Sequence, residues 1–254
     1  MSLSAIDYLL WGAATVLLLV TCGALLKRKL VQELPAFSVY VAFHVVRTVV
    51  LFAIYWLYLH HRTSYADYFY VYWTAETGSI VLGFAVIYEI YGKVFQNYRA
   101  LRQLGGILFT GAAVVLLVAA VLTAAAAPGA DDPGVVRAVF LLERSVRVMQ
   151  CGLLGLLFVL AFCFGLRWRN RVFGIALGFG LFASIELAAV AVRSQVGVAA
   201  SATYSQVASA AYSCGVLIWV CYLVAPEPAL QYRGAVLHHD LEKWNQALQE
   251  MLQR

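Results

Sequence analysis

Long apolar runs, separated by short polar connections, are the feature of this sequence that most limits its fold. Apolar residues make up 63% of the 254 residues and charged residues only 12%, whereas soluble domains have about 45–50% and about 25%. A hydrocarbon core about 30 Å thick requires about 20 residues of helix to cross it. The runs therefore predict an all-α integral membrane protein, and they leave no room for a soluble catalytic domain in this chain.

The apolar runs predict a seven-transmembrane helix bundle over residues 1–226 and a cytoplasmic amphipathic tail helix over residues 227–254. The first run begins close to Met1 with neither a basic stretch nor a small-residue cleavage site, so we expect it to be retained. Pro35 suits the first turn of the second span, and Pro226 ends the seventh. The predicted spans are Ile6–Leu26, Ala36–Leu59, Tyr68–Tyr91, Gly105–Ala125, Val136–Leu166, Val172–Arg193 and Tyr204–Val224.

Basic residues collect in every second connection between the predicted spans. They follow spans 1, 3 and 5, whereas the opposite connections carry Arg62, an acidic segment at 127–134 and an uncharged stretch at 194–203. Short cytoplasmic loops collect Lys and Arg, so the N-terminus is predicted outside and the C-terminus in the cytoplasm. The chain contains no N-x-S/T sequon, which favours a bacterial inner membrane. The basic residues are Lys27, Arg28, Lys29, Lys93, Arg99, Arg102, Arg167, Arg169 and Arg171.

Ionisable residues within the spans are the strongest functional signal in the sequence, because such residues usually face a bundle interior or an aqueous cavity. By the helical rise of about 1.5 Å per residue, five of them reach similar depths in their spans. We therefore predict one connected polar region in the outer half of the bundle. Its charged members are Arg47, Glu76, Glu143, Arg147 and Glu186.

The spacing of polar residues along single spans extends this region. Glu143, Arg147 and Gln150 follow i, i+4 and i+7, so one helix face carries acid, base and amide, and Arg144 flanks that face. Spans 2 and 7 carry similar stripes, which we expect to close a polar pocket. The predicted ligand-binding residues are His44, Arg47, Glu76, Glu143, Arg144, Arg147, Gln150, Glu186 and Tyr212, with Tyr40, Ser209 and Ser213 on the same stripes.

Three interpretations of this polar region remain open. Its ion pairs can fix the register of the helices, line an outward-opening site for a small molecule or lipid, or form part of a proton or ion pathway. A pathway requires polar groups that continue to the inner face, where the spans supply chiefly Glu89. We expect Glu89 to pair with loop arginines.

Small residues suggest how the spans pack. Gly174 and Gly178 form a small-xxx-small pair in span 6, and Gly152 and Gly155 reduce the width of span 5 because glycine has no side chain. Such residues let helices approach closely in lipid. Span 4 carries no charge and is rich in Ala, Gly and Val, so it is predicted to lie at the periphery.

Several membrane activities lack the residues that they require. A retinal Schiff base needs a lysine in the last span, and none occurs there. Haem needs axial ligands from facing helices, but His44 is the only histidine well inside a span. The spans also lack the His and Asp ligands of a zinc hydrolase, a GxSG nucleophile and any CxxC pair. The sequence therefore argues against an enzyme and leaves any cofactor unknown, although a carboxylate-based mechanism stays open.

Two amphipathic features lie at the ends of the predicted bundle. Aromatic residues crowd the outer ends of spans 2 and 3, where they form either an interfacial belt or the mouth of a ligand or pigment site. In the tail, an apolar stripe fits a helix that lies on the inner leaflet or docks on a partner protein. The stripe consists of Leu237, Leu241, Trp244, Leu248 and Met251.

The predicted function is that of a non-enzymatic, receptor-like or accessory membrane subunit that binds a small molecule or lipid in its polar pocket. The topology resembles the membrane-sensor part of seven-span receptors, although no diagnostic motif accompanies that resemblance. Two alternatives remain: a small transporter or channel that uses the Glu/Arg cluster, and a structural subunit of a larger membrane complex. We expect contacts with the bilayer and with a partner protein through the tail, and none with nucleic acid.

Overall fold

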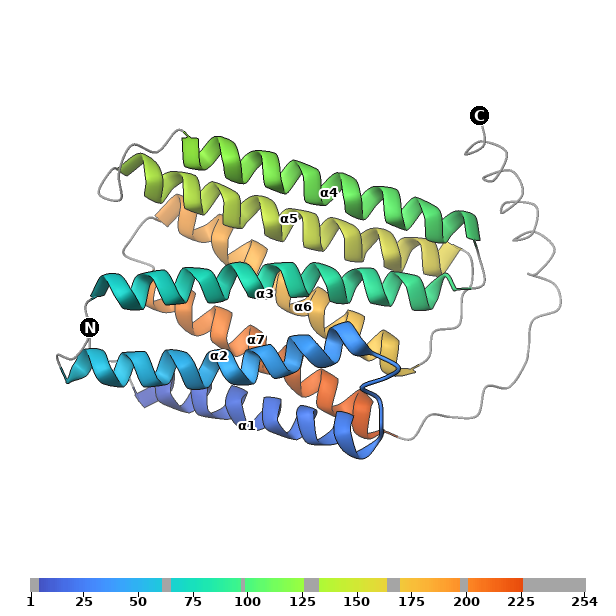
Figure 1. Cartoon of the computed structure of the whole chain (residues 1–254), viewed down its shortest axis with the longest axis horizontal. Coiled ribbons are helices and arrows are strands. Elements are labelled where there is room, and N and C mark those ends of the chain that lie inside the picture. The colour runs from blue at the N-terminus through green and yellow to red at the C-terminus, as the bar shows by residue number, and fades with distance from the viewer. Residues whose placement is uncertain are drawn as a thin grey trace.

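Seven α-helices account for all regular secondary structure in the residues that the computed structural model describes, which are 5–60, 65–96, 99–125, 133–163, 170–196 and 201–225. The helices run along the long axis of the molecule, and consecutive helices are antiparallel (Figure 1). The predicted tail helix lies outside the described residues. The helices are α1 (Ala5–Lys27), α2 (Pro35–Leu59), α3 (Tyr65–Val94), α4 (Arg99–Ala125), α5 (Pro133–Cys163), α6 (Asn170–Val196) and α7 (Ser201–Val224).

Six of the seven helices contain a segment that is long and apolar enough to cross a membrane. The protein is thus an all-helical, multi-pass membrane protein. In helix α4, too few consecutive side chains belong to the described part of the chain to form such a segment. The candidate spans are Leu9–Lys27, Pro35–Tyr58, Val71–Val94, Ser145–Cys163, Arg171–Ala189 and Gln206–Val224.

The helices are arranged so that α4 lies at one edge. It packs against α3 and α5 within the described part of the chain, in the peripheral position expected from its composition (Figure 1). At the other side, α7 packs between α6 and α1. The space between α2 and the α6–α7 pair is filled by large aromatic side chains. The ring centroids of Phe37 and Trp219 lie 5.3 Å apart, and those of Tyr40 and Phe179 lie 5.0 Å apart.

Glycines bring α6 and α7 into close contact, as the sequence predicts for Gly174 and Gly178. A Cβ atom on Gly178 would overlap the ring of Trp219 and lie 2.8 Å from the carbonyl oxygen of Gly215. The same expectation is wrong for Gly152 and Gly155 on α5, because an added Cβ there would meet no atom within 4 Å. Of these four glycines, the two on α6 therefore serve helix approach, and Gly215 faces Gly178 from α7.

Helix α1 ends in a Schellman motif, although no glycine is present. Lys29 adopts a left-handed conformation with φ 54°, its N–H donates to the carbonyl of Leu26, and the N–H of Leu30 donates to that of Leu25. Leu25 and Leu30 are both buried, which supplies the apolar contact of the motif. The reversal directs Arg28 toward the end of α7. There its guanidinium donates to the carbonyl oxygens of Val224, the last residue of the helix, and of Ala225, which follows it.

Helix α2 begins without a capping side chain of its own, since its N-cap residue is Leu34. In place of the expected loop arginines, the carboxylate of Glu89 on α3 accepts hydrogen bonds from the backbone N–H groups of Ala36 (3.2 Å) and Phe37 (3.0 Å). Pro35 has no N–H to satisfy, so Glu89 completes the first turn of α2. Glu89 on α3 therefore stabilises the start of α2.

Candidate functional site

Four charged side chains from four helices form a chain of alternating charge, called here the ionic network: Arg47, Glu76, Arg147 and Glu186. Arg47 Nη2 on α2 lies 2.5 Å from Glu76 Oε2 on α3. The other oxygen of Glu76 lies 3.5 Å from Arg147 Nη2 on α5. Arg147 Nε in turn lies 2.6 Å from Glu186 Oε2 on α6. The network therefore joins α2, α3, α5 and α6, and its formal charges sum to zero.

The position of these residues along antiparallel helices explains why they meet. Each lies roughly three to four turns from the same end of the bundle, at which α2, α4 and α6 end and α3, α5 and α7 begin. This end, on the left of Figure 1, is called the network end, and the other is called the opposite end. The equal-depth argument from the sequence thus corresponds to a real grouping in space.

Arg147 is the centre of the network. It is 7% exposed, as is Glu186, and it contacts carboxylates of two helices. Its Nη1 also donates to Oε1 of the buried Gln150 at 3.1 Å, and its guanidinium lies over the ring of Phe182 at 5.3 Å. Buried charge is tolerated when it is paired and hydrogen-bonded in this way.

A neutral layer of polar and aromatic groups adjoins the network on α2, α3 and α7. His44, which is buried, shares a 2.9 Å hydrogen bond between its Nε2 and Ser79 Oγ. Its ring stacks on Tyr212 with centroids 5.5 Å apart and lies 4.3 Å from the ring of Tyr40. The Tyr212 hydroxyl is buried and makes no hydrogen bond to the described residues. The Ser213 hydroxyl, on the same helix, donates to the carbonyl oxygen of Ser209 at 2.9 Å.

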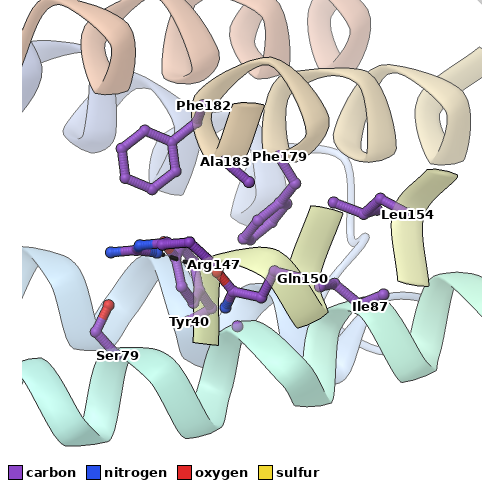
Figure 2. Close-up of a pocket in the computed structure, with 10 residues that line it drawn as sticks. Tyr40, Ser79, Ile87, Arg147, Gln150, Leu154, Phe179, Phe182 and Ala183 are labelled. Atoms are coloured by element: carbon purple, nitrogen blue, oxygen red, sulfur yellow. Dashed lines mark hydrogen bonds between the residues drawn. The ribbon is translucent and has the colours of Figure 1, made fainter. Parts of the chain in front are cut away.

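The cavity beside Arg147 is small. Its volume of about 10 Å³ gives room for about one water molecule, whereas sites for small molecules measure about 300–1,000 Å³. Figure 2 shows Arg147 and Gln150 side by side at this cavity. Apolar side chains from α3, α5 and α6 close it toward the opposite end. They are Ile87, Leu154 and Phe179.

The structure brings together most of the predicted ligand-binding residues. Arg47, Glu76, Arg147, Gln150 and Glu186 are in direct contact through the bonds given above, and His44 and Tyr212 form the adjoining layer. The two others, Glu143 and Arg144, belong to α5, but their side chains lie outside the described part of the chain. A ligand-binding role for any of these residues stays a prediction.

Sequence reasoning missed three residues that shape the site. Ser79 and Gly83 follow Glu76 by three and seven positions, so helical periodicity alone would have placed them on its face. Gly83 leaves room for the Gln150 amide, whose Nε2 would lie 3.2 Å from an added Cβ. Phe182 gave no comparable signal, because aromatic residues are frequent in every span.

No three His, Cys, Asp or Glu side chains in the described segments gather closely enough to hold a metal ion. The chemistry available at the site is therefore that of paired charges, one imidazole and buried hydroxyl and amide groups. Comparison of this chain with known protein families, with curated proteins and with solved structures finds no match.

Proposed function

We propose that this protein is a non-enzymatic, receptor-like or accessory subunit of a bacterial inner membrane, in which the ionic network responds to a ligand or partner. The observation that carries the proposal is the position of Arg147, which contacts carboxylates from two other helices and, through Glu76, is linked to Arg47 on a third. A shift of any one of these four helices changes at least one of the three ion pairs. A switch requires an element with two discrete arrangements, and we propose that a ligand or partner shifts this network to a second one.

The proposal includes seven spans, with α4 as the seventh, the N-terminus outside and the C-terminus in the cytoplasm. Charged side chains at the opposite end support this orientation, because Lys27, Lys93, Arg102 and Arg171 all lie where α1 and α3 end or α4 and α6 begin. Single cysteines introduced into the 164–169 and 126–132 connections test it by labelling with an impermeant reagent in intact cells. Labelling of the 164–169 connection from outside would contradict the proposed orientation.

A receptor fits the site better than a transporter does. The cavity beside Arg147 holds about one water molecule and is closed by apolar side chains toward the opposite end. A carrier needs a polar path that reaches both faces in turn. Uptake into proteoliposomes that is lost in Glu76→Gln would favour the transporter, and stoichiometric co-purification of other subunits would favour the structural role.

The decisive experiment distinguishes a network that responds to a ligand or partner from one that only fixes the register of the helices. Native mass spectrometry of the gently solubilised protein first identifies what co-purifies with it, whether small molecule, lipid or partner protein. The same measurement is then made on Arg147→Gln, on Glu186→Gln and on the double variant, together with thermal unfolding. The double variant removes one charge of each sign, so it preserves neutrality while it abolishes the 2.6 Å pair.

We expect each single variant to lose stability because an uncompensated charge remains, and we expect the double variant to regain it. If the network is the responsive element, the double variant folds but no longer retains the co-purifying species. Recovery of both stability and retention would contradict the proposal and leave the network as a device that fixes helix register.

A further inference from the structure

A second polar site lies at the opposite end of the bundle, far along α3 from the ionic network. It is an open groove of about 300 Å³ between the end of α3 and the first turn of α4. This volume reaches the range of small-molecule sites, unlike the cavity beside Arg147. The polar residues that line this α3–α4 groove are Tyr88, Glu89, Tyr91, Lys93, Gln96 and Arg102.

The groove presents positive charge. Neither Lys93 nor Arg102 forms a salt bridge within 4 Å in the described part of the chain. Glu89 is the one acidic residue of the lining, and both its oxygens already accept N–H groups from the first turn of α2. The positive end of that helix dipole offsets the carboxylate charge. Lys93 also interacts electrostatically with the Glu89 carboxylate, but without an ion pair to it in the described part of the chain, so both cations and the Gln96 amide can face an incoming anion.

Tyr91 supplies an independent indication of a ligand. Its side chain is 2% exposed, and its hydroxyl is buried without a hydrogen-bond partner among the described residues. The ring is held in place by Gly105 on α4, where an added Cβ would overlap it, and by Phe95, 4.5 Å away between centroids. A buried hydroxyl costs free energy unless it is paired. An oxygen atom of a ligand in the groove would provide that pair.

The surroundings indicate the source of the anion. The groove lies at the end of the candidate span Val71–Val94, so it faces the level of the membrane–water interface. Exposed apolar surface continues from it along the bundle, including the aromatic ring of Tyr88, which is 51% exposed, and Ile107, which is 58% exposed. A phosphate in the groove could thus be attached to an acyl chain lying along α3 and α4. Basic pockets between spans bind lipid headgroups in this way.

We propose that the α3–α4 groove binds the phosphate of an anionic lipid headgroup, with Lys93 and Arg102 pairing with its charge and the Tyr91 hydroxyl donating to one of its oxygens. The site is separate from the ionic network and does not depend on the function proposed above. Charge-assisted hydrogen bonds of this kind are about twice as strong as neutral ones.

The role of the two cations is tested by measuring how much phosphatidylglycerol the protein retains. The full chain is placed in mixed phosphatidylglycerol–phosphatidylcholine nanodiscs, and retention is measured by native mass spectrometry. Lys93→Gln combined with Arg102→Gln is expected to lower retention about 30-fold, from the contribution of two basic residues. The matched control, Lys27→Gln with Lys29→Gln, removes the same charge from exposed positions at the same end of the bundle. Equal losses in both double variants would overturn the proposal.

Tyr91→Phe tests the hydroxyl and separates a ligand from a packing defect. We expect retention of phosphatidylglycerol to fall roughly tenfold, as for one hydrogen bond to a charged group, while the fold is kept. Tyr222→Phe, on α7, is the control. Unchanged retention with a raised melting temperature would show that the hydroxyl is merely unpaired and would overturn its role. Displacement of the lipid by millimolar inorganic phosphate would assign the groove to a soluble phosphate and overturn the lipid assignment.

Discussion

The two ends of the bundle use charge in different ways. At the network end, charged side chains pair with one another, and Arg147 contacts Glu76 and Glu186 from two other helices. At the opposite end, two charged side chains pair with backbone: Glu89 accepts two N–H groups at the start of α2, and Arg28 donates to carbonyls at the end of α7. Charges of the first kind balance each other, whereas those of the second kind replace hydrogen bonds that a helix end lacks.

This difference has a consequence for substitution. A balanced pair can be removed as a pair, because no charge is then left without a partner. A side chain that completes a helix end cannot be compensated by removing another side chain, since the backbone groups that it satisfies remain. The network end should therefore show strong coupling between substitutions, and the opposite end should show nearly additive ones.

The largest effect is expected at the network end, from Arg147→Ala. The variant leaves Glu186 and one oxygen of Glu76 without their cation, and breaking a buried pair costs about 3–5 kcal/mol. Reversible unfolding in detergent micelles measures the loss. Arg47→Ala serves as the comparison, because Arg47 contacts one carboxylate and is more exposed, with 16% of its side chain accessible. A loss from Arg47→Ala as large as that from Arg147→Ala would contradict the central position of Arg147.

The next largest effect is expected at the opposite end, from Glu89→Ala. The N–H groups of Ala36 and Phe37 lose their acceptor, and the loss of a helix cap costs about 0.5–2 kcal/mol. Hydrogen exchange at Ala36 and Phe37 should rise together with the fall in stability. Glu33→Ala, which removes the same charge from an exposed position before α2, is the control. Similar exchange in both variants would show that charge alone stabilises the start of the helix.

The sequence predicts the network better than it predicts the opposite end, for a physical reason. Charges inside apolar spans are few, and the fixed rise of a helix converts residue number into depth, so Arg47, Glu76, Arg147 and Glu186 could be grouped in advance. Which residue pairs with which depends on the rotation of each helix. Residue spacing therefore cannot predict that Arg147 lies 2.6 Å from Glu186 but 3.5 Å from Glu76.

The depth of a residue in its helix does not predict which groups Glu89 and the glycines contact. A backbone N–H group has no sequence signature, so a carboxylate that completes a distant helix looks like any other charge near a loop. Gly178 and Gly152 sit in similar small-residue patterns, yet Gly178 faces α7 and Gly152 faces open space. The pattern permits close approach, and only the position of a neighbouring helix decides whether approach occurs.

A smaller effect is expected from Ser79→Ala, which removes a neutral hydrogen bond beside the network. The variant leaves His44 Nε2 without its 2.9 Å partner, at a cost of about 1 kcal/mol. Thr77→Ala is the matched control on the same helix, because the Thr77 hydroxyl is exposed and bonds to its own helix at Trp73. If Ser79→Ala costs as much as Arg147→Ala, burial of polar groups in general, and not the pairing of charges, distinguishes the network end.

The smallest effect is expected from Arg28→Gln at the end of α7. The Arg28 side chain is exposed, so water can replace its bonds to Val224 and Ala225, and the loss should stay below about 1 kcal/mol. Arg28→Lys separates the two contributions, since lysine keeps the charge near the negative end of the helix dipole but loses the two-pronged geometry of the guanidinium. Hydrogen exchange in the last turn of α7 is the measurement. Protection that lysine restores would assign the effect to the dipole; protection lost equally in both variants would assign it to hydrogen bonds, as the comparison between the two ends predicts.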